Sequence, residues 1–376
     1  MGIPEPTILE VTGDLSGLDE AIEAVPNCAA VFLIRPREGA PYLARTGLLR
    51  RRLKRMLGER THPSRLLNLR QIVSRIEYWP TGSGLEATFV LYELGRRHFP
   101  GAYLKLLNLR MPPYVKIVLS NPFPRSQITT RLGQTPSLYY GPFRSRSAAE
   151  QFESQVLDLF QMRRCQEDLD PSPSHPGCIY GEMNMCLRPC QQRVTQAEYQ
   201  SEVGRVVEFL STDGRSLSAV IASDRDRRSE QMNFEEAARQ HKRLEKIQQI
   251  LKLADELARD IDRLCGVSVT PSVAPDSVEL WFVLAGRRLP PRRFDFGVVD
   301  GKTVSLDQRL REVVASLRPA RLSLREKQEQ LALLARWCYS SWRDGEWLSF
   351  GSLEEIPYRK LVRAISRVAA AARPSN

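Results

Sequence analysis

Long apolar segments are missing from this sequence of 376 residues. The longest, such as 29–34 and 369–372, fall far short of the roughly 20 residues that a membrane-spanning helix needs. The N-terminal stretch MGIPEPTILEVTGDL contains acidic residues but no lysine or arginine, which does not fit a secretory signal. We therefore expect a soluble, cytoplasmic protein that has no membrane partner.

Cysteine is also scarce, because the chain has seven, too few for a disulfide framework at this length. Three are isolated, whereas four crowd into 26 positions, namely Cys165, Cys178, Cys186 and Cys190. In a reducing compartment such a group predicts a metal or iron–sulfur site, although four unrelated thiols are the simpler alternative. Four thiolates can hold either Zn²⁺ or a 4Fe–4S cluster, and the lack of the C-x2-C pairs typical of zinc sites favours the cluster.

Positive charge is in excess, with 55 Lys and Arg against 44 Asp and Glu, a net charge of +11. Twelve of the basic residues lie between Arg35 and Arg75, where only two residues are acidic. This segment includes a predicted helix with an apolar stripe of Leu49, Leu53, Met56 and Leu57. A solvated helix face is the plain alternative, but the density of charge favours contact with DNA phosphates through Arg45, Arg50, Arg51, Arg52, Lys54 and Arg55.

The length predicts two to four domains, and the pattern of apolar residues alternates between strand and helix. Strands are predicted at 29–34, 41–44, 76–79 and 114–119, and helices at 45–60 and 85–99. Thr195 and Glu198 form a capping-box pattern that predicts a helix start, and a second helix is expected over 216–262, so that the two would form a hairpin. A β-hairpin is predicted over 278–299, followed by a helix with Leu331, Leu334, Cys338 and Trp342 on one face and another with Leu361, Ile365 and Val368.

Several of these motifs together resemble the N-terminal half of the UvrC family, the incision subunits of bacterial nucleotide excision repair. The resemblance runs from about Pro26 to Val299 and includes the turn Tyr140–Phe143, the cysteine region, and the segment Asn233–Arg239. It implies a 4Fe–4S cluster on the four cysteines, with zinc as the alternative, and DNA as a ligand. It also implies that a UVR-type motif binds a UvrB-like partner through Phe234, Ala237, Ala238, Leu244 and Ile247.

The first part of the chain resembles a GIY-YIG nuclease domain, a family that holds one divalent cation through a helix glutamate. Two expected site residues are present, Tyr42 and Arg52. Four positions depart from the family pattern: Phe32 replaces a tyrosine, Ala44 a glycine, Leu91 the metal-binding glutamate and Tyr103 an asparagine. By helical spacing, Glu86, Glu93 and His98 do not substitute for that glutamate. We therefore expect the nuclease to be lost or crippled, with Mg²⁺ or Mn²⁺ needed only if it is active.

The expected fold is α+β in five parts. These are an N-terminal extension (1–24), a small GIY-YIG-like mixed domain (25–108), a connector with the four-cysteine region (109–193), a UVR-like helical hairpin (194–264) and a small C-terminal α/β domain (265–376). The last is too short for the second nuclease domain of the UvrC family.

Three functions follow as hypotheses. The first is a UvrC-like repair protein that binds DNA and UvrB and has lost its nuclease. The second is an active, structure-specific GIY-YIG endonuclease that makes a single incision near lesions. The third is a redox-responsive nucleic-acid-binding protein that uses the cluster as a sensor, which leaves the UVR-like segment unexplained.

Overall fold

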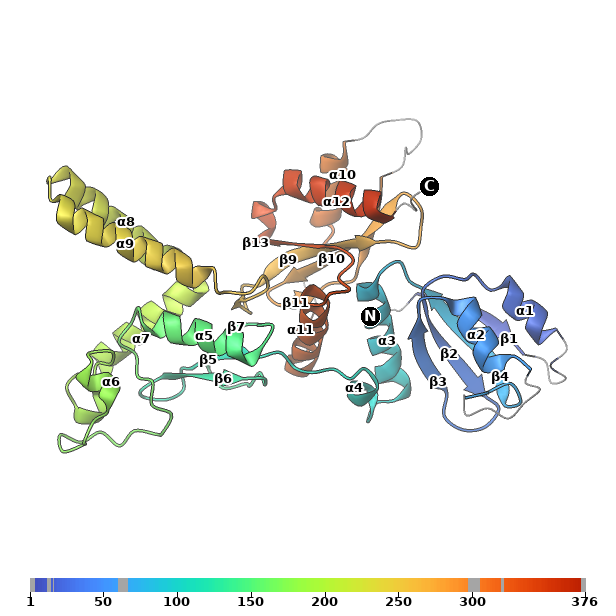
Figure 1. Cartoon of the computed structure of the whole chain (residues 1–376), viewed down its shortest axis with the longest axis horizontal. Coiled ribbons are helices and arrows are strands. Elements are labelled where there is room, and N and C mark those ends of the chain that lie inside the picture. Colours follow the sequence, from blue (N-terminus) through green and yellow to red (C-terminus); the bar gives the residue numbers. More distant parts are fainter. Residues whose placement is uncertain are drawn as a thin grey trace.

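The computed structural model describes residues 4–11, 15, 17–59, 67–296, 305–318 and 321–372. These residues form a mixed α+β fold with three separate antiparallel sheets (Figure 1). Within the described ranges, no helix is both long and apolar enough to cross a membrane.

The first sheet has the strand order β1 (Thr7–Glu10), β4 (Val73–Pro80), β2 (Ala30–Pro36) and β3 (Tyr42–Thr46). Helices α1 (Leu18–Ala24) and α2 (Leu49–Leu57) cover one face, and α3 (Gly84–His98) packs on the other. The apolar stripe predicted for α2 is buried, as expected. Within the expected N-terminal extension, β1 pairs with β4 and α1 buries Leu18 and Ile22 against α2, so both elements pack on the first sheet.

The second sheet belongs to the connector, in the order β6 (Arg125–Thr129), β5 (Tyr114–Val118), β7 (Ser137–Gly141) and β8 (Arg259–Asp260). Helices α5 (Arg146–Leu157) and α7 (Gln196–Ser211) share its core, in which Tyr140 stacks on Phe152 with ring centroids 4.9 Å apart. The capping box at Thr195 is confirmed. Because α7 packs on this sheet and β8 returns to it, the expected hairpin unit of 194–264 does not separate from the connector.

Helices α8 (Arg215–Glu230) and α9 (Phe234–Leu251) form the helical hairpin, which projects from the rest of the molecule (Figure 1). The expected single helix over 216–262 is therefore wrong. Met232 has a positive φ of 57°, which breaks the helix, and the Asn233 side chain accepts a hydrogen bond from the Glu236 N–H to cap α9. The turn lies directly before the predicted UVR-like segment Asn233–Arg239, so the hairpin joins α8 to α9 and not to α7.

The C-terminal sheet has the order β11 (Arg287–Arg288), β10 (Ser277–Leu284), β9 (Cys265–Pro271) and β13 (Glu346–Phe350), and β12 (Arg292–Asp295) also pairs with β10. Helices α10 (Leu306–Ala315) and α12 (Tyr358–Ala372) cover one face, and α11 (Leu324–Cys338) covers the other. Trp342 lies beyond the end of α11, so its predicted place on that helix is wrong. The end of the predicted β-hairpin, 297–299, lies outside the described residues.

One apolar cluster joins the parts of the chain. It combines α3, the short helix α4 (Tyr103–Leu106), Tyr139 of the connector and α11. Helix α3 therefore lies between the first sheet and α11 (Figure 1). Leu91, the expected metal position on α3, therefore contacts apolar residues of both the first sheet and the α11 region.

Candidate functional site

The two retained site residues of the nuclease-like domain contact each other. Tyr42 projects from β3 and Arg52 from α2, and an Arg52 Nη2–H donates to the Tyr42 hydroxyl oxygen over 3.2 Å. The neighbouring Phe32 is fully buried, pairs with Ala44 across the strands and lies with its ring centroid 6.1 Å from that of Tyr42. The predicted pair is thus brought together, beside a phenylalanine that has no hydroxyl to offer.

Leu91, at the expected metal position, is half-buried on α3. Its side chain packs against two apolar clusters, one with β2 and β3 and one with α11. A carboxylate in this position would lose part of its hydration without a cation to compensate, which is costly. The surroundings of Leu91 therefore suit an apolar side chain.

Tyr103, at the expected asparagine position, is occupied by internal hydrogen bonds. Its hydroxyl donates to Glu329 Oε1 of α11 over 2.7 Å, and the Tyr92 hydroxyl donates to Oε2 of the same carboxylate, also over 2.7 Å. Arg325 pairs with Glu329 and donates to Tyr103 as well. Burial and the adjacent Glu329 raise the pKa of Tyr103. This tyrosine connects the first domain to α11 and is not available to a substrate.

Two of the three residues weighed as substitutes for the missing glutamate, Glu86 and Glu93, contact other groups. Glu86 accepts a hydrogen bond from the Gly82 N–H over 2.7 Å, and burial raises its pKa to about 7. Glu93 faces Arg288, with 3.8 Å between Oε1 and Nη2. Burial and the charge of Arg35 lower the pKa of His98. In the part of the chain that the structure describes, no group of three or more His, Cys, Asp or Glu side chains is arranged to hold a metal ion.

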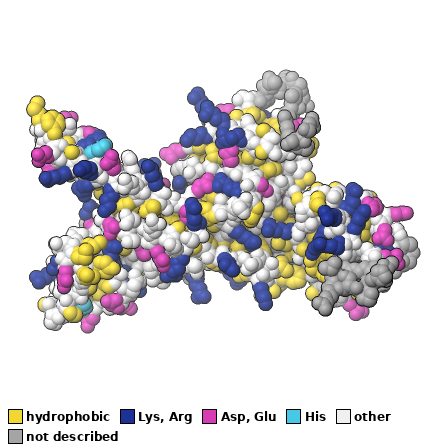
Figure 2. Space-filling model, in the orientation of Figure 1, with side chains coloured by type: hydrophobic (Ala, Val, Ile, Leu, Met, Phe, Trp, Pro, Cys, Tyr) yellow, Lys and Arg dark blue, Asp and Glu magenta, His cyan; other side chains and the backbone are white. Residues whose placement is uncertain are grey.

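Some of the basic residues predicted to bind DNA share one exposed surface, and others do not. Arg51, Lys54 and Arg55 are exposed on α2, where Figure 2 shows a group of Lys and Arg side chains. Lys54 forms an ion pair with Glu23, and the Arg50 Nε–H donates to the Val25 carbonyl oxygen over 2.7 Å. The exposed charge is therefore concentrated on the outer side of α2.

Arg45 differs from the α2 group, because it points toward α3 and the C-terminal region. It donates to Thr88 Oγ1 over 3.2 Å, and its guanidinium carbon lies 5.5 Å from the ring centroid of Trp342. Burial, with a contribution from the charge of Arg336, lowers the pKa of Arg45. Arg45, which was predicted to contact DNA, therefore lies apart from the exposed arginines of α2 and within the electrostatic influence of Arg336 on α11.

The four clustered cysteines lie in the loop region that follows α5. Cys178 precedes α6 (Ile179–Glu182), Cys190 lies in the short helix η1 (Pro189–Gln191), and all four are free thiols. Burial raises the pKa of Cys186 to about 11, and the charges of the other three add to the effect. The four thiols match in kind the ligands of an iron–sulfur or zinc site, but the structure of the described residues does not arrange three of them to hold a metal ion, so the site stays a prediction.

Two of these sulfurs, those of Cys165 and Cys186, each lie close to an N–H donor. An Arg163 Nη1–H lies 3.4 Å from Cys165 Sγ, and the Arg188 backbone N–H lies at the same distance from Cys186 Sγ. Such donors favour the thiolate that metal ligation requires. Arg163 is itself buried and also donates to the Glu167 carbonyl oxygen, so it holds the loop in place.

The predicted partner-binding strip on α9 is divided by the fold. Phe234 is 66% exposed at the start of the helix, and Ala238 is also exposed, with Ala237 half-buried beside them. Ile247 is fully buried in the connector core, and Leu244 packs against that core. Only the outer part of the strip is accessible, and Figure 2 shows hydrophobic side chains at that end of the hairpin.

Sequence reasoning missed two features of these sites. Met232, 78% exposed at the hairpin turn, adds to the apolar end beside Phe234. Its position directly before the predicted UVR-like segment is the sequence signal that could have identified it. The contact between Tyr103 and Glu329 joins residues 226 positions apart, and no local pattern indicates it.

Comparison with known proteins shows which proteins this chain resembles. Residues 113–209, from β5 to α7, match the model for the UvrC/Cho excinuclease middle domain. The chain is similar to the UvrABC system protein C of Caldanaerobacter subterraneus, with 25% identity over 72% of this chain and 44% of the relative. It is also similar to that of Ruminiclostridium cellulolyticum, with 22% identity over 85% of this chain and 53% of the relative. The chain thus spans about half the length of these curated relatives, and no solved structure matches it.

Proposed function

We propose that this chain, which belongs to the UvrC family, acts in nucleotide excision repair by binding DNA and a UvrB-like partner, with its own GIY-YIG nuclease lost or crippled. The observation that carries the loss of cutting is the packing of Leu91 between two apolar clusters. A cation that activates water or neutralises a phosphate needs an oxygen ligand at the site, and Leu91 offers none.

DNA binding does not need the missing groups. Phosphate neutralisation requires charge and access, both of which Arg51 and Arg55 have on the outer side of α2. Arg52 keeps its hydrogen bond to Tyr42 and so holds a guanidinium group at the edge of the same surface. We infer that the retained pair serves binding rather than cutting.

The partner site is proposed at the outer end of the hairpin. Phe234 and Met232 expose apolar surface there that the fold itself does not cover. Exposed aromatic residues of this kind are typical anchors of protein interfaces. A UvrB-like protein is the partner that the family membership favours.

The four cysteines are proposed to hold a 4Fe–4S cluster that orders the loops around α6 and η1. The cluster would replace the hydrophobic burial that this polar segment lacks. Anaerobically purified protein should show a broad visible absorbance band that Cys178→Ser removes. A colourless protein that contains zinc would contradict the iron–sulfur assignment.

The binding proposal is tested by assembling the complex. A fluorescently labelled duplex that carries a lesion is titrated with the protein, with and without UvrB. We expect direct binding to the duplex and a larger ternary complex when UvrB is added. Failure to bind either DNA or UvrB would contradict the proposed function, whereas cutting of the duplex would favour the active endonuclease, which the Arg52–Tyr42 contact alone supports.

A further inference from the structure

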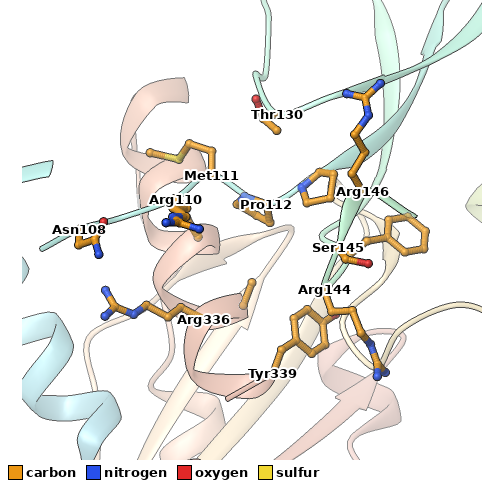
Figure 3. A pocket seen from close by; sticks show the side chains of 14 residues that line it. Asn108, Arg110, Met111, Pro112, Thr130, Arg144, Ser145, Arg146, Arg336 and Tyr339 are labelled. Carbon is orange, nitrogen blue, oxygen red and sulfur yellow. The ribbon is translucent and has the colours of Figure 1, made fainter. Parts of the chain in front are cut away.

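A pocket with a basic rim lies at the junction of the connector and α11. Its volume is about 720 Å³, within the range of sites that hold sizeable ligands. Four segments form it: the chain at 108–113, Thr130 after β6, the turn that leads into α5 and the end of α11 (Figure 3). None of the residues predicted to bind DNA lies in it.

The lining of the pocket combines guanidinium groups with an apolar floor. Among the described residues that line it, four are arginines and none is acidic: Arg110, Arg144, Arg146 and Arg336. Pro112 and Tyr339 lie between them (Figure 3). The Tyr339 hydroxyl donates to the Pro142 carbonyl oxygen and accepts from the Leu257 N–H, so the ring is held in place.

The pocket retains net positive charge after its ion pairs are counted. Arg144 pairs with Asp255 and Arg146 with Glu150 over 2.7 Å, so four guanidinium groups less two carboxylates leave a charge of two. Within the described residues, Arg110 makes no hydrogen bond or ion pair. Its full charge therefore faces the pocket and solvent.

Two further features add positive potential. Helix α5, twelve residues long, begins at the rim, where Ser145 caps it, so its positive end lies at the pocket. On the other side, the Arg336 Nη1–H donates to the Leu107 carbonyl oxygen, and its charge acts on Arg45 of the first domain. Positive charge therefore extends from Arg45 past Arg336 into the pocket.

We propose that this pocket binds the phosphodiester backbone of a DNA strand, with a sugar or base against the apolar floor. Arginine forks suit phosphate oxygens, and fixed aromatic and proline surfaces suit nucleotides. The proposal rests on the DNA binding proposed above and assigns it a second contact, apart from α2. The alternative ligand is an acidic segment of a protein, and the test must distinguish it from DNA.

The test uses the full chain and a charge reversal in the pocket. Arg110→Glu combined with Arg146→Glu is compared with Arg363→Glu, which reverses an exposed charge on α12, on the opposite face of the C-terminal sheet. Arg110→Ala, at a side chain that has no partner among the described residues, serves as a second variant that should not disturb folding. Fluorescence anisotropy of labelled single-stranded and duplex oligonucleotides is measured over a range of salt concentrations, with inorganic pyrophosphate as a free competitor.

We expect the double variant to bind DNA at least tenfold more weakly, and Arg363→Glu to stay within twofold of the unmodified protein. The slope of log Kd against log salt should fall by about 2, since about one unit is lost per phosphate contact. Arg110→Ala should lower the affinity and the slope by about half as much on a logarithmic scale. If the pocket binds a DNA strand, pyrophosphate should compete only at concentrations far above that of the DNA. Competition at a similar concentration would indicate a site for free phosphates.

Each other outcome overturns the proposal. If Arg51→Glu with Arg55→Glu on α2 abolishes DNA binding while the pocket variants bind normally, the pocket is not a DNA site and the proposed function stands. If the unmodified protein binds no DNA, the proposed function and the pocket assignment both fail. If the pocket variants bind DNA normally but lose UvrB, the pocket is a protein site.

Discussion

In the first domain, Phe32 and Tyr103 are buried and satisfied by internal contacts, whereas at the outer end of the hairpin Phe234 and Met232 face solvent. The sequences of both regions resemble motifs of the UvrC family. A side chain that is enclosed by its own fold cannot reach a ligand, while an exposed aromatic residue contributes little to its own fold. We propose that internal packing has replaced the cutting function in the first domain and that the partner surface of the hairpin has been kept.

The strongest way to break this comparison is Leu91→Glu. Because Leu91 packs against two apolar clusters, the glutamate should lower the free energy of unfolding by about 4 kcal/mol and restore no cutting. Leu91→Met should cost less than about 1.5 kcal/mol. Urea denaturation measures both, and a stable glutamate variant that nicks DNA would show that the position is still a metal site.

Glu86 tests whether the nearest carboxylates are committed to the fold. Burial raises its pKa to about 7, with Glu279 nearby raising it further and Arg293 opposing. The folded state therefore binds a proton more tightly than the unfolded state, so this group lowers stability as pH rises from about 4.5 to about 7. Across that window the loss should be about 3 kcal/mol, and Glu86→Gln should remove it. Identical pH profiles for the two proteins would mean that Glu86 is freely solvated.

The retained side of the comparison depends on Phe234. Phe234→Ala should weaken binding to UvrB by about 2 kcal/mol, roughly thirtyfold in Kd, without changing the melting temperature. Ile179→Ala, which removes a similarly exposed apolar side chain on α6, is the matched control. Equal affinity of the two variants for UvrB would place the partner surface elsewhere.

The smallest expected effect is at Tyr103. Tyr103→Phe removes one hydrogen bond to the Glu329 carboxylate and should lower the free energy of unfolding by about 1 kcal/mol. Tyr180→Phe, on the exposed helix α6, should change nothing measurable. If Tyr103→Phe instead leaves stability intact and alters DNA binding, Tyr103 contacts a ligand rather than α11.

Much of the fold was predictable because burial follows the apolar pattern. The stripe of α2, the capping box at Thr195 and the strand that begins at Tyr114 all formed where their residues indicated. The break before α9 was missed, because it depends on Met232 in a left-handed conformation and not on glycine or proline. The pocket around Arg110 was not predicted, since it brings together segments as far apart in the sequence as 108–113 and 332–339.

The central claim is that the first domain no longer cuts. The most direct test incubates the pure protein with an end-labelled duplex that carries a lesion, in Mg²⁺ or Mn²⁺, with and without UvrB, and resolves the products on a denaturing gel. The account predicts intact strands under every condition. Nicking on the 3′ side of the lesion, abolished by Arg52→Ala, would contradict it.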